Sequence, residues 1–260
     1  RWFGTTDRGH PGVARLLQGG DCFVGGEIAL LNRHSFAKTE YSLTPAQVRA
    51  ICDNNGWAQV VGFHTRNTPH RAHEYVQMQA LERVGGDGLL IHPVLGQKKP
   101  GDFTQEAIFT GYEALINAHY PKDQVLLSGF FANSWYSGPR EAVFTAICRK
   151  NFGCSHFIVG RDHTGVGEFY QPNDVAALFE KLGDIGIEPL FFDEVIFDFN
   201  KNQYREVHSD AEGGEQSRIS GTAIRRYIAG GEAPPEWMMR AEVSAALLGI
   251  ASQGRPIFEP

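Results

Sequence analysis

The chain has 260 residues, with 24 basic and 30 acidic side chains and a formal net charge of −6. A hydrophobic content of 42% against 21% charged residues excludes an intrinsically disordered chain, and the length allows a substantial core. The acidic balance argues against a nucleic-acid-binding protein, but it permits a local basic pocket for a small anion. No apolar run reaches the roughly 18 residues that span a bilayer, so we expect no membrane partner.

The cysteines and the first residue bear on the compartment and on the extent of the chain. Cys22, Cys52, Cys148 and Cys154 are scattered, and no CxxC pair exists. This usage argues against a disulfide framework and favours a reducing, cytoplasmic location. The chain has no recognisable signal peptide and opens at Arg1 rather than Met, so we expect a piece of a longer, multidomain chain.

Residues 1–44 are punctuated by Gly and Pro, with short apolar pairs between the turns, which predicts loops and short strands. Either Ser42 or Thr44 is expected to cap a helix that runs through residue 52, with Pro45 in its first turn.

Short apolar runs then alternate with helical patterns. Strands are predicted over 57–64, 88–95, 124–131, 155–159 and 187–192, and helices over 70–84, 105–118, 139–152 and 172–182. Continuously apolar strands in a βαβα alternation predict an α/β fold with a doubly wound parallel sheet, whose ligands bind at the carboxyl ends of the strands. The remaining elements are a hairpin over 195–207, a polar linker over 209–217 and closing helices over 220–229 and 236–248.

A dense polar sequence, HTRNTPHRAH at 64–73, follows the first predicted strand. His70 and His73 are three residues apart, on one face of the first turn of a helix whose N-terminus favours anions. Arg66 and Arg71 add positive charge, so the segment is a candidate anion site. Arg71 has an alternative interpretation as a solvated ion-pair partner, and zinc is disfavoured because no further ligands lie nearby in the sequence.

A second polar cluster, GRDHTGVG at 160–167, follows a later strand at the same edge of the sheet. Its glycines permit close backbone approach, Arg161 offers a charged fork, and Asp162 is placed to orient that fork. An ordinary glycine-rich loop explains the segment equally well when it is taken alone. Its position opposite the first cluster favours a shared site.

Three further segments carry basic residues close to predicted element ends. Ser220 begins a helix that contains Arg225 and Arg226, and its alternative role is that of an N-cap. The loop GQKKPG at 96–101 and the turn SGPRE at 137–141 either line the pocket or form surface turns. The sequence contains no GxxxxGK[ST] loop, no GxGxxG after the first strand and no GxSxG elbow, which argues against P-loop ATPases and dinucleotide oxidoreductases.

These clusters, in this order, resemble the ATP sulfurylase (sulfate adenylyltransferase) family of HxGH-type nucleotidyltransferases. The matching passages are GTTDRGHPGV (4–13), TRNTPHRAHEY (65–75), HPVLGQKKPGD (92–102), GPREA (138–142), RKNFGCSHFIVGRDHTG (149–165) and ISGTAIRR (219–226). The likeness runs from about residue 4 to residue 248. It implies a remnant of a β-rich N-terminal domain with a linker at 1–44, a Rossmann-like nucleotidyltransferase domain at 45–212 and a helical subdomain at 213–260.

The resemblance implies transfer of AMP from ATP to sulfate, which gives adenosine 5′-phosphosulfate and pyrophosphate. Sulfate is already a dianion at neutral pH, so the nucleophile needs no general base. The protein must instead hold two mutually repelling anions in line and neutralise the charge that develops on the phosphates. The resemblance further implies that Mg²⁺ arrives with ATP, that the protein itself holds no metal, and that the chain forms a homo-oligomer.

By the resemblance, one group of residues clamps sulfate, another holds the ATP phosphates and stabilises leaving pyrophosphate, and a third borders the adenosine. The implied catalytic residues are Arg66, Asn67, His70, His73 and Arg161. The implied substrate-binding residues are His64, Thr65, Arg66, Arg161 and Thr164. The implied nucleotide-binding residues are Asn67, His70, His73, Gly160, Asp162, His163 and Val195.

Three departures from the family pattern concern the acceptor. His64 stands where the family has a sulfate-binding Gln, Pro69 lies one place later than the family's proline, and Thr164 replaces an Ala. His64 exchanges an amide donor for a ring whose charge depends on pH. Two alternatives therefore stay open: a nucleotidyltransferase for another oxyanion, such as a phosphonate, a sulfonate or a phosphorylated metabolite, and a catalytically lapsed nucleotide-binding module.

Overall fold

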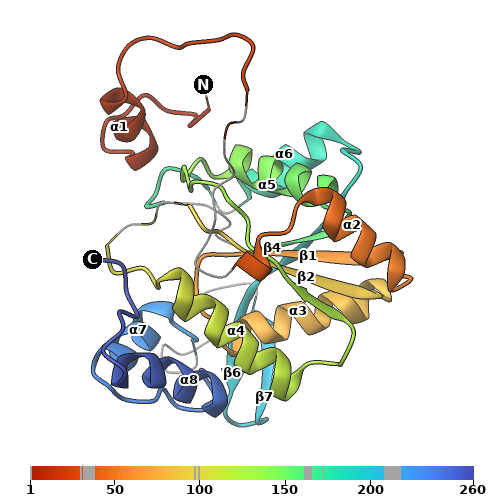
Figure 1. Ribbon diagram of the computed structural model, residues 1–260, viewed down its shortest axis with the longest axis vertical. Helices are drawn as coiled ribbons and strands as arrows, with labels where there is room; N and C mark the ends of the chain where they lie inside the picture. The colour runs from red at the N-terminus through yellow and green to blue at the C-terminus, as the bar shows by residue number, and fades with distance from the viewer. Residues whose placement is uncertain are drawn as a thin grey trace.

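A computed structural model describes residues 2–29, 31, 39–96, 98, 100–160, 166–171, 173–207 and 218–260. Five parallel strands form a sheet in the order β3-β2-β1-β4-β5 (Figure 1). The strands are β1 (Val60–Thr65), β2 (Gly88–Pro93), β3 (Val125–Leu127), β4 (His156–Gly160) and β5 (Glu188–Phe192). The chain winds outward from β1 in one direction and from β4 in the other, so the predicted doubly wound α/β fold is confirmed.

Helices cover both faces of the sheet (Figure 1). One face carries α3 (Arg71–Val84) and α4 (Gln105–His119), and the other carries α2 (Pro45–Asn54), α5 (Pro139–Asn151) and α6 (Asp174–Leu182). The alternation of strand side chains explains the two layers: in β2, Leu89 and Ile91 join the first core cluster, and Leu90 joins the second. Strands β1, β2 and β4 bury apolar side chains on both faces of the sheet, which is why they have continuous hydrophobic runs in the sequence.

The structure selects Thr44 rather than Ser42 as the N-cap of α2. The Thr44 side chain accepts a hydrogen bond from the backbone N–H of Gln47, and the Gln47 side chain accepts one from Thr44 in return. Pro45 occupies the first helical position, as predicted.

The lead-in segment differs from expectation. Its described residues contain no strand before β1; instead, residues 11–18 form the helix α1 (Pro11–Gln18), followed by the short 3-10 helix η1 (Thr39–Tyr41). The prediction of short strands there is wrong because His10 caps the helix, Pro11 starts it and the apolar residues Val13, Leu16 and Leu17 share one helical face. The division of the chain at residues 44 and 212 stays a prediction.

Two further boundaries move. Strand β3 ends at Leu127, and the Gly129 N–H donates to the Tyr41 carbonyl; the chain then pairs again beside β2 through a parallel bridge between Phe130 and Val94. The last helix, α8 (Ala241–Ser252), starts later than predicted because the Pro235 carbonyl accepts from the N–H groups of Met238 and Met239 in a preceding turn.

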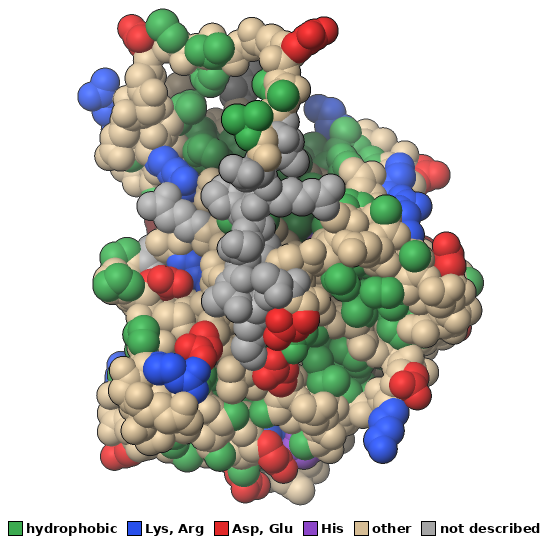
Figure 2. Space-filling model, in the orientation of Figure 1, with side chains coloured by type: hydrophobic (Ala, Val, Ile, Leu, Met, Phe, Trp, Pro, Cys, Tyr) green, Lys and Arg blue, Asp and Glu red, His purple; other side chains and the backbone are tan. Residues whose placement is uncertain are grey.

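The C-terminal part completes the fold. The predicted hairpin is confirmed as β6 (Glu194–Asp198) and β7 (Gln203–Val207), and α7 (Gly221–Ala229) and α8 pack beside α4 (Figure 1). On the face shown in Figure 2, acidic and basic side chains are interspersed and histidine is almost absent. Within the described residues, no helix combines the length and apolarity that crossing a bilayer requires.

Candidate functional site

A cavity of about 270 Å³ lies where the sheet changes direction, between the carboxyl ends of β1 and β4. It is lined by Phe63, His64, Ala72, His73, Val76, Ile158, Gly160, Phe192, Asp193 and Val195. Complete ligand pockets start at about 300 Å³, so this cavity is sized for part of a ligand. The walls are mainly apolar, and the polar side chains in the lining are His64 on β1, His73 on α3 and Asp193 after β5.

His70 and His73 stand at the start of α3. His70 is the N-cap, and its Nδ1 atom accepts from the backbone N–H of His73 at 3.4 Å. The two rings stack with centroids 3.6 Å apart. Burial, with a smaller contribution from the Arg225 charge, lowers the pKa of His70 to about 4, and burial beside His70 holds the pKa of His73 well below its usual value. Both rings are therefore neutral at pH 7 and offer polar contacts without a fixed charge.

Arg66 follows β1 and is held by an aromatic ring. Its guanidinium lies 5.0 Å from the centroid of the Tyr136 ring, and its Nη1 atom is buried without a hydrogen-bond partner among the described residues. Tyr136 has a φ of 59°, which is unfavourable for a residue with a side chain. The buried Glu141 carboxylate stabilises this turn by accepting from the N–H groups of Trp135 and Ser137 at 3.0 and 2.9 Å. The turn SGPRE therefore serves the site instead of forming a surface turn.

His10 ties the lead-in segment to the same turn. It is fully buried; its Nδ1 atom accepts from the first N–H groups of α1, and its Nε2 atom lies 3.0 Å from both the Tyr136 carbonyl and the Tyr170 hydroxyl. The passage that contains His10 thus supports the ring that packs on Arg66.

A second group of charged residues surrounds Asn67. The Asn67 Oδ1 atom accepts from the Arg225 guanidinium on α7 at 2.6 Å, and the same guanidinium nitrogen lies 3.5 Å from the Asp102 carboxylate. Lys98 donates from Nζ to the Phe103 carbonyl at 2.9 Å. Burial, helped by the Arg66 charge and opposed by nearby carboxylates, lowers the pKa of Lys98 to about 8. The loop GQKKPG therefore faces the site through Lys98.

Thr65 has a local structural role. Its hydroxyl lies 3.1 Å from the backbone nitrogen of Asn67 and 3.3 Å from the Asn67 carbonyl oxygen, and the residue is 5% exposed. These contacts form the tight turn that follows β1. Its predicted contact with substrate stays a prediction.

His64 is joined to a buried arginine. The Arg149 guanidinium, on α5, donates from Nη2 to the His64 Nδ1 atom at 2.7 Å. Burial lowers the pKa of Arg149 to about 10, so it is charged at neutral pH. Gly62 leaves space for this side chain, because a Cβ at position 62 would lie 2.9 Å from the Arg149 Cγ atom. Arg149 therefore contacts a residue of the site, although its position inside a predicted helix gave no indication of this.

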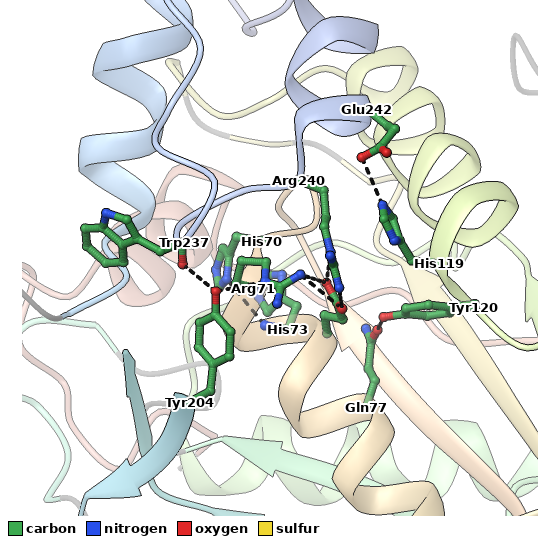
Figure 3. A network of polar contacts seen from close by, with 11 residues as sticks. His70, Arg71, His73, Gln77, His119, Tyr120, Tyr204, Trp237, Arg240 and Glu242 are labelled. Atoms are coloured by element: carbon green, nitrogen blue, oxygen red, sulfur yellow. Dashed lines mark hydrogen bonds and ion pairs between the residues drawn. The ribbon is translucent and has the colours of Figure 1, made fainter. Parts of the chain in front are cut away.

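Residues of β7 and of the segment before α8 hold the start of α3 (Figure 3). The Arg71 backbone N–H donates to the Met238 carbonyl at 2.9 Å, and its side chain donates to Glu74 and to the Tyr204 hydroxyl. The Glu74 carboxylate also pairs with Arg240. Arg71 is thus an ion-pair partner, as the alternative interpretation held, but it is half-buried and orients the helix that carries the two histidines.

The structure brings most of the predicted residues to one edge of the sheet. His64, His73, Gly160 and Val195 line the cavity, and Arg66, Asn67 and His70 lie on the segment between β1 and α3 that joins His64 to His73. The predicted residues Arg161, Asp162, His163 and Thr164 lie outside the described residues. Lys98, Glu141 and Arg225 belong to the three segments whose place in the pocket the sequence left open. Sequence reasoning left Tyr136 and Arg149 out of the site. The available signal was that Arg149 begins one matching passage and that Tyr136 lies two residues before another.

The fold and this site define a doubly wound α/β domain with a ligand site at its topological switch point. An ATP-sulfurylase family model matches residues 39–249. A sulfate adenylyltransferase of Symbiobacterium thermophilum is 46% identical over 260 residues, covering 98% of this chain and 66% of that protein. A sulfate adenylyltransferase of Pyrococcus abyssi is 47% identical over 242 residues, covering 93% and 63%. The chain therefore belongs to the ATP-sulfurylase family.

The chain spans slightly less than two thirds of the length of the curated relatives it matches, at 66%, 64% and 63% for the first three. Among solved structures, a hexameric APS kinase from Thiobacillus denitrificans superposes with a TM-score of 0.64 at 24% identity. That superposition covers 84% of this chain and 41% of the other, and at this identity it shows the fold alone.

Proposed function

We propose that the protein transfers AMP from ATP to sulfate, giving adenosine 5′-phosphosulfate and pyrophosphate. The observation that carries this proposal is that the family's anion-binding passage, residues 64–73, lies at the switch-point cavity of a chain 46% identical to sulfate adenylyltransferases over nearly its whole length. An ATP-dependent enzyme for another oxyanion remains the alternative to be tested, because His64 and Thr164 depart from the family pattern.

The reaction needs little acid–base chemistry. A sulfate oxygen forms a bond to the α-phosphorus, the bond from that phosphorus to the bridging oxygen breaks, and the electron pair leaves with pyrophosphate. No proton is transferred, so a catalytic carboxylate is unnecessary. Mg²⁺ bound to ATP supplies further neutralisation of the phosphate charge.

The site residues fall into three groups, according to the part of the substrates to which each is assigned. Arg66, whose Nη1 atom has no partner among the described residues, and Arg161, which the structure does not describe, are assigned to sulfate. Asn67, His70 and His73 are assigned to the ATP phosphates, where the N-terminus of α3 adds a partial positive charge. Gly160 and Val195 are assigned to the adenosine, because they line the apolar part of the cavity.

The test is pyrophosphate release from ATP and Mg²⁺ with sulfate, compared with a phosphonate and a sulfonate in its place. We expect release with sulfate and a loss of at least a hundredfold in His73→Ala without loss of folding. His119→Ala is the matched control, because His119 pairs with Glu242 in a separate pocket. Release with another oxyanion but not with sulfate would identify that oxyanion as the acceptor. ATP binding without pyrophosphate release would indicate a catalytically lapsed nucleotide-binding module.

Two properties of the whole protein follow as proposals. The four cysteines are all free, which supports a cytoplasmic location. Leu16 and Leu17 on α1 and Phe144 and Ile147 on α5 are 42%, 52%, 46% and 40% exposed, and such apolar side chains support a homo-oligomer. Sedimentation of the purified chain tests the second proposal.

A further inference from the structure

Arg149 is buried without an acidic partner. It is 0% exposed, and among the described residues it donates only to neutral acceptors: the His64 Nδ1 atom at 2.7 Å, the His92 carbonyl at 3.2 Å and the Thr145 carbonyl at 3.4 Å. Its guanidinium also lies 4.1 Å from the centroid of the Phe130 ring. Burying a guanidinium without a carboxylate is costly, so its presence at the end of β1 points to a role in the site.

The hydrogen bond to His64 determines where that ring carries its proton. A guanidinium has five N–H donors and no acceptor, so the Nδ1 atom of His64 must accept. A proton on Nδ1 would face the N–H of Arg149 at 2.7 Å, which leaves the tautomer protonated on Nε2. His64 lines the cavity, so its ring in this tautomer offers an N–H donor to a ligand bound there.

We propose that Arg149 is a positioning residue that makes His64 a hydrogen-bond donor, and that this donor favours a fully ionised oxyanion over one that carries a proton. The inference rests on the proposed function for the place of the acceptor anion. Sulfate carries no proton near neutral pH, whereas hydrogen phosphate has a P–O–H group that needs an acceptor. When that group faces the N–H of His64 it is left unsatisfied, which disfavours phosphate at this contact.

Not every group near this cavity is a donor. The side chain of Arg66 offers donors alone, whereas Asp193 and the neutral ring of His73 line the same cavity and offer acceptors, so the constraint applies to the His64 contact. The charge of Arg66 also acts on the Glu141 carboxylate, but the two oxygens of Glu141 accept from the N–H groups of Trp135 and Ser137. Glutamine at position 64 would meet the same constraint, because its carbonyl would accept from Arg149 and its NH₂ group would face the site.

Nitrogen-15 NMR of the histidine-labelled chain tests the tautomer directly. The His64 signals are assigned by their loss in His64→Gln. We expect Nε2 to be protonated and Nδ1 unprotonated at pH 7 in the wild type, and a tautomeric mixture in Arg149→Met. A wild-type ring protonated on Nδ1, or one that exchanges rapidly between the two forms, would overturn the proposal.

Selectivity is tested by the sulfate KM and by competitive inhibition with inorganic phosphate, with calorimetry of both anions as a readout independent of turnover. In Arg149→Met the sulfate KM should rise about 10- to 100-fold, as for loss of a hydrogen bond to a charged group, while phosphate inhibition is kept or strengthened. His64→Leu should lose the same selectivity, whereas His64→Gln should lose less than about tenfold. The comparison of His64→Leu with His64→Gln tests the selectivity for sulfate over phosphate even if Arg149→Met does not fold.

The outcomes separate this inference from the proposed function. Sulfate turnover with unchanged discrimination against phosphate in His64→Leu would refute the inference and leave the function standing. Absence of turnover with every oxyanion, together with an Nε2-protonated His64 and tighter calorimetric binding of sulfate than of phosphate, would refute the function and support the inference.

Discussion

Asn67 at the end of β1 and Arg225 on α7 are joined by a hydrogen bond of 2.6 Å from the guanidinium to the Asn67 Oδ1 atom, although 158 positions separate them in sequence. The same guanidinium reaches the Asp102 carboxylate at 3.5 Å. Helix α7 therefore contributes a charge and a positioning contact to the site at the β1 end.

We expect Arg225→Met to lower kcat/KM for ATP by about 10- to 100-fold, because it removes a charged hydrogen bond to Asn67. The matched control is Arg226→Met, since the neighbouring Arg226 is exposed. Pyrophosphate release measures the activity, and urea unfolding checks that both variants fold. Equal activity in the two variants would show that the Asn67–Arg225 contact has no part in turnover.

The ring of Tyr136 is predicted to matter more than its hydroxyl. Tyr136→Gly removes the ring over Arg66 but relieves a φ of 59°, so the loss of unfolding free energy should be small, about 1 kcal/mol or less. The sulfate KM should rise about fivefold, the size of one cation–π contact. Tyr136→Phe keeps the ring and should retain a KM close to that of the wild type. A similar KM in the glycine and phenylalanine variants would contradict this role.

Lys98 gives the site a pH dependence. Its pKa of about 8 means that the amine loses its charge as pH rises through this value, so one positive charge disappears from the site above pH 8. We expect the KM for ATP to rise several-fold between pH 7 and 9.5 in the wild type and to stay flat in Lys98→Arg, because arginine remains charged throughout. Lys98→Met should show the raised KM at both pH values. A wild-type KM that is flat across this range would contradict the assignment.

His70 links stability to pH. Its folded pKa of about 4 lies below the unfolded value of about 6.5, so the unfolded chain binds the proton first. The contribution of His70 to the free energy of unfolding is complete above pH 6.5 and is lost as the pH falls toward 4. Between pH 7.5 and 5 the contribution is on the order of 2 kcal/mol. Urea unfolding should show a smaller pH-dependent loss in His70→Asn, where asparagine preserves the N-cap. An unchanged pH-dependent loss of stability in His70→Asn would show that a group other than His70 takes up the proton.

Much of the fold could be predicted from local sequence patterns. The periodicities of 2 and 3.6 residues, Pro45, Pro139 and the glycine that follows α3 placed most helices and strands within a few residues. The predictions failed where a tertiary contact decided the local structure, as at α1, where the buried His10 side chain caps the helix. They also failed at the end of β3, where the strand is interrupted after Leu127 by the contact of Gly129 with the Tyr41 carbonyl and pairs again only at Phe130.

Local patterns and short passages of fixed spacing are enough to predict the fold class, the edge of the sheet where the candidate site lies and the family. The contact of Arg149 with His64, the hydrogen bond from Arg225 to Asn67 and the lowered pKa of Lys98 become visible only in the folded chain. Those properties depend on burial and on distances between atoms far apart in the chain, and neither quantity is written in the order of the residues.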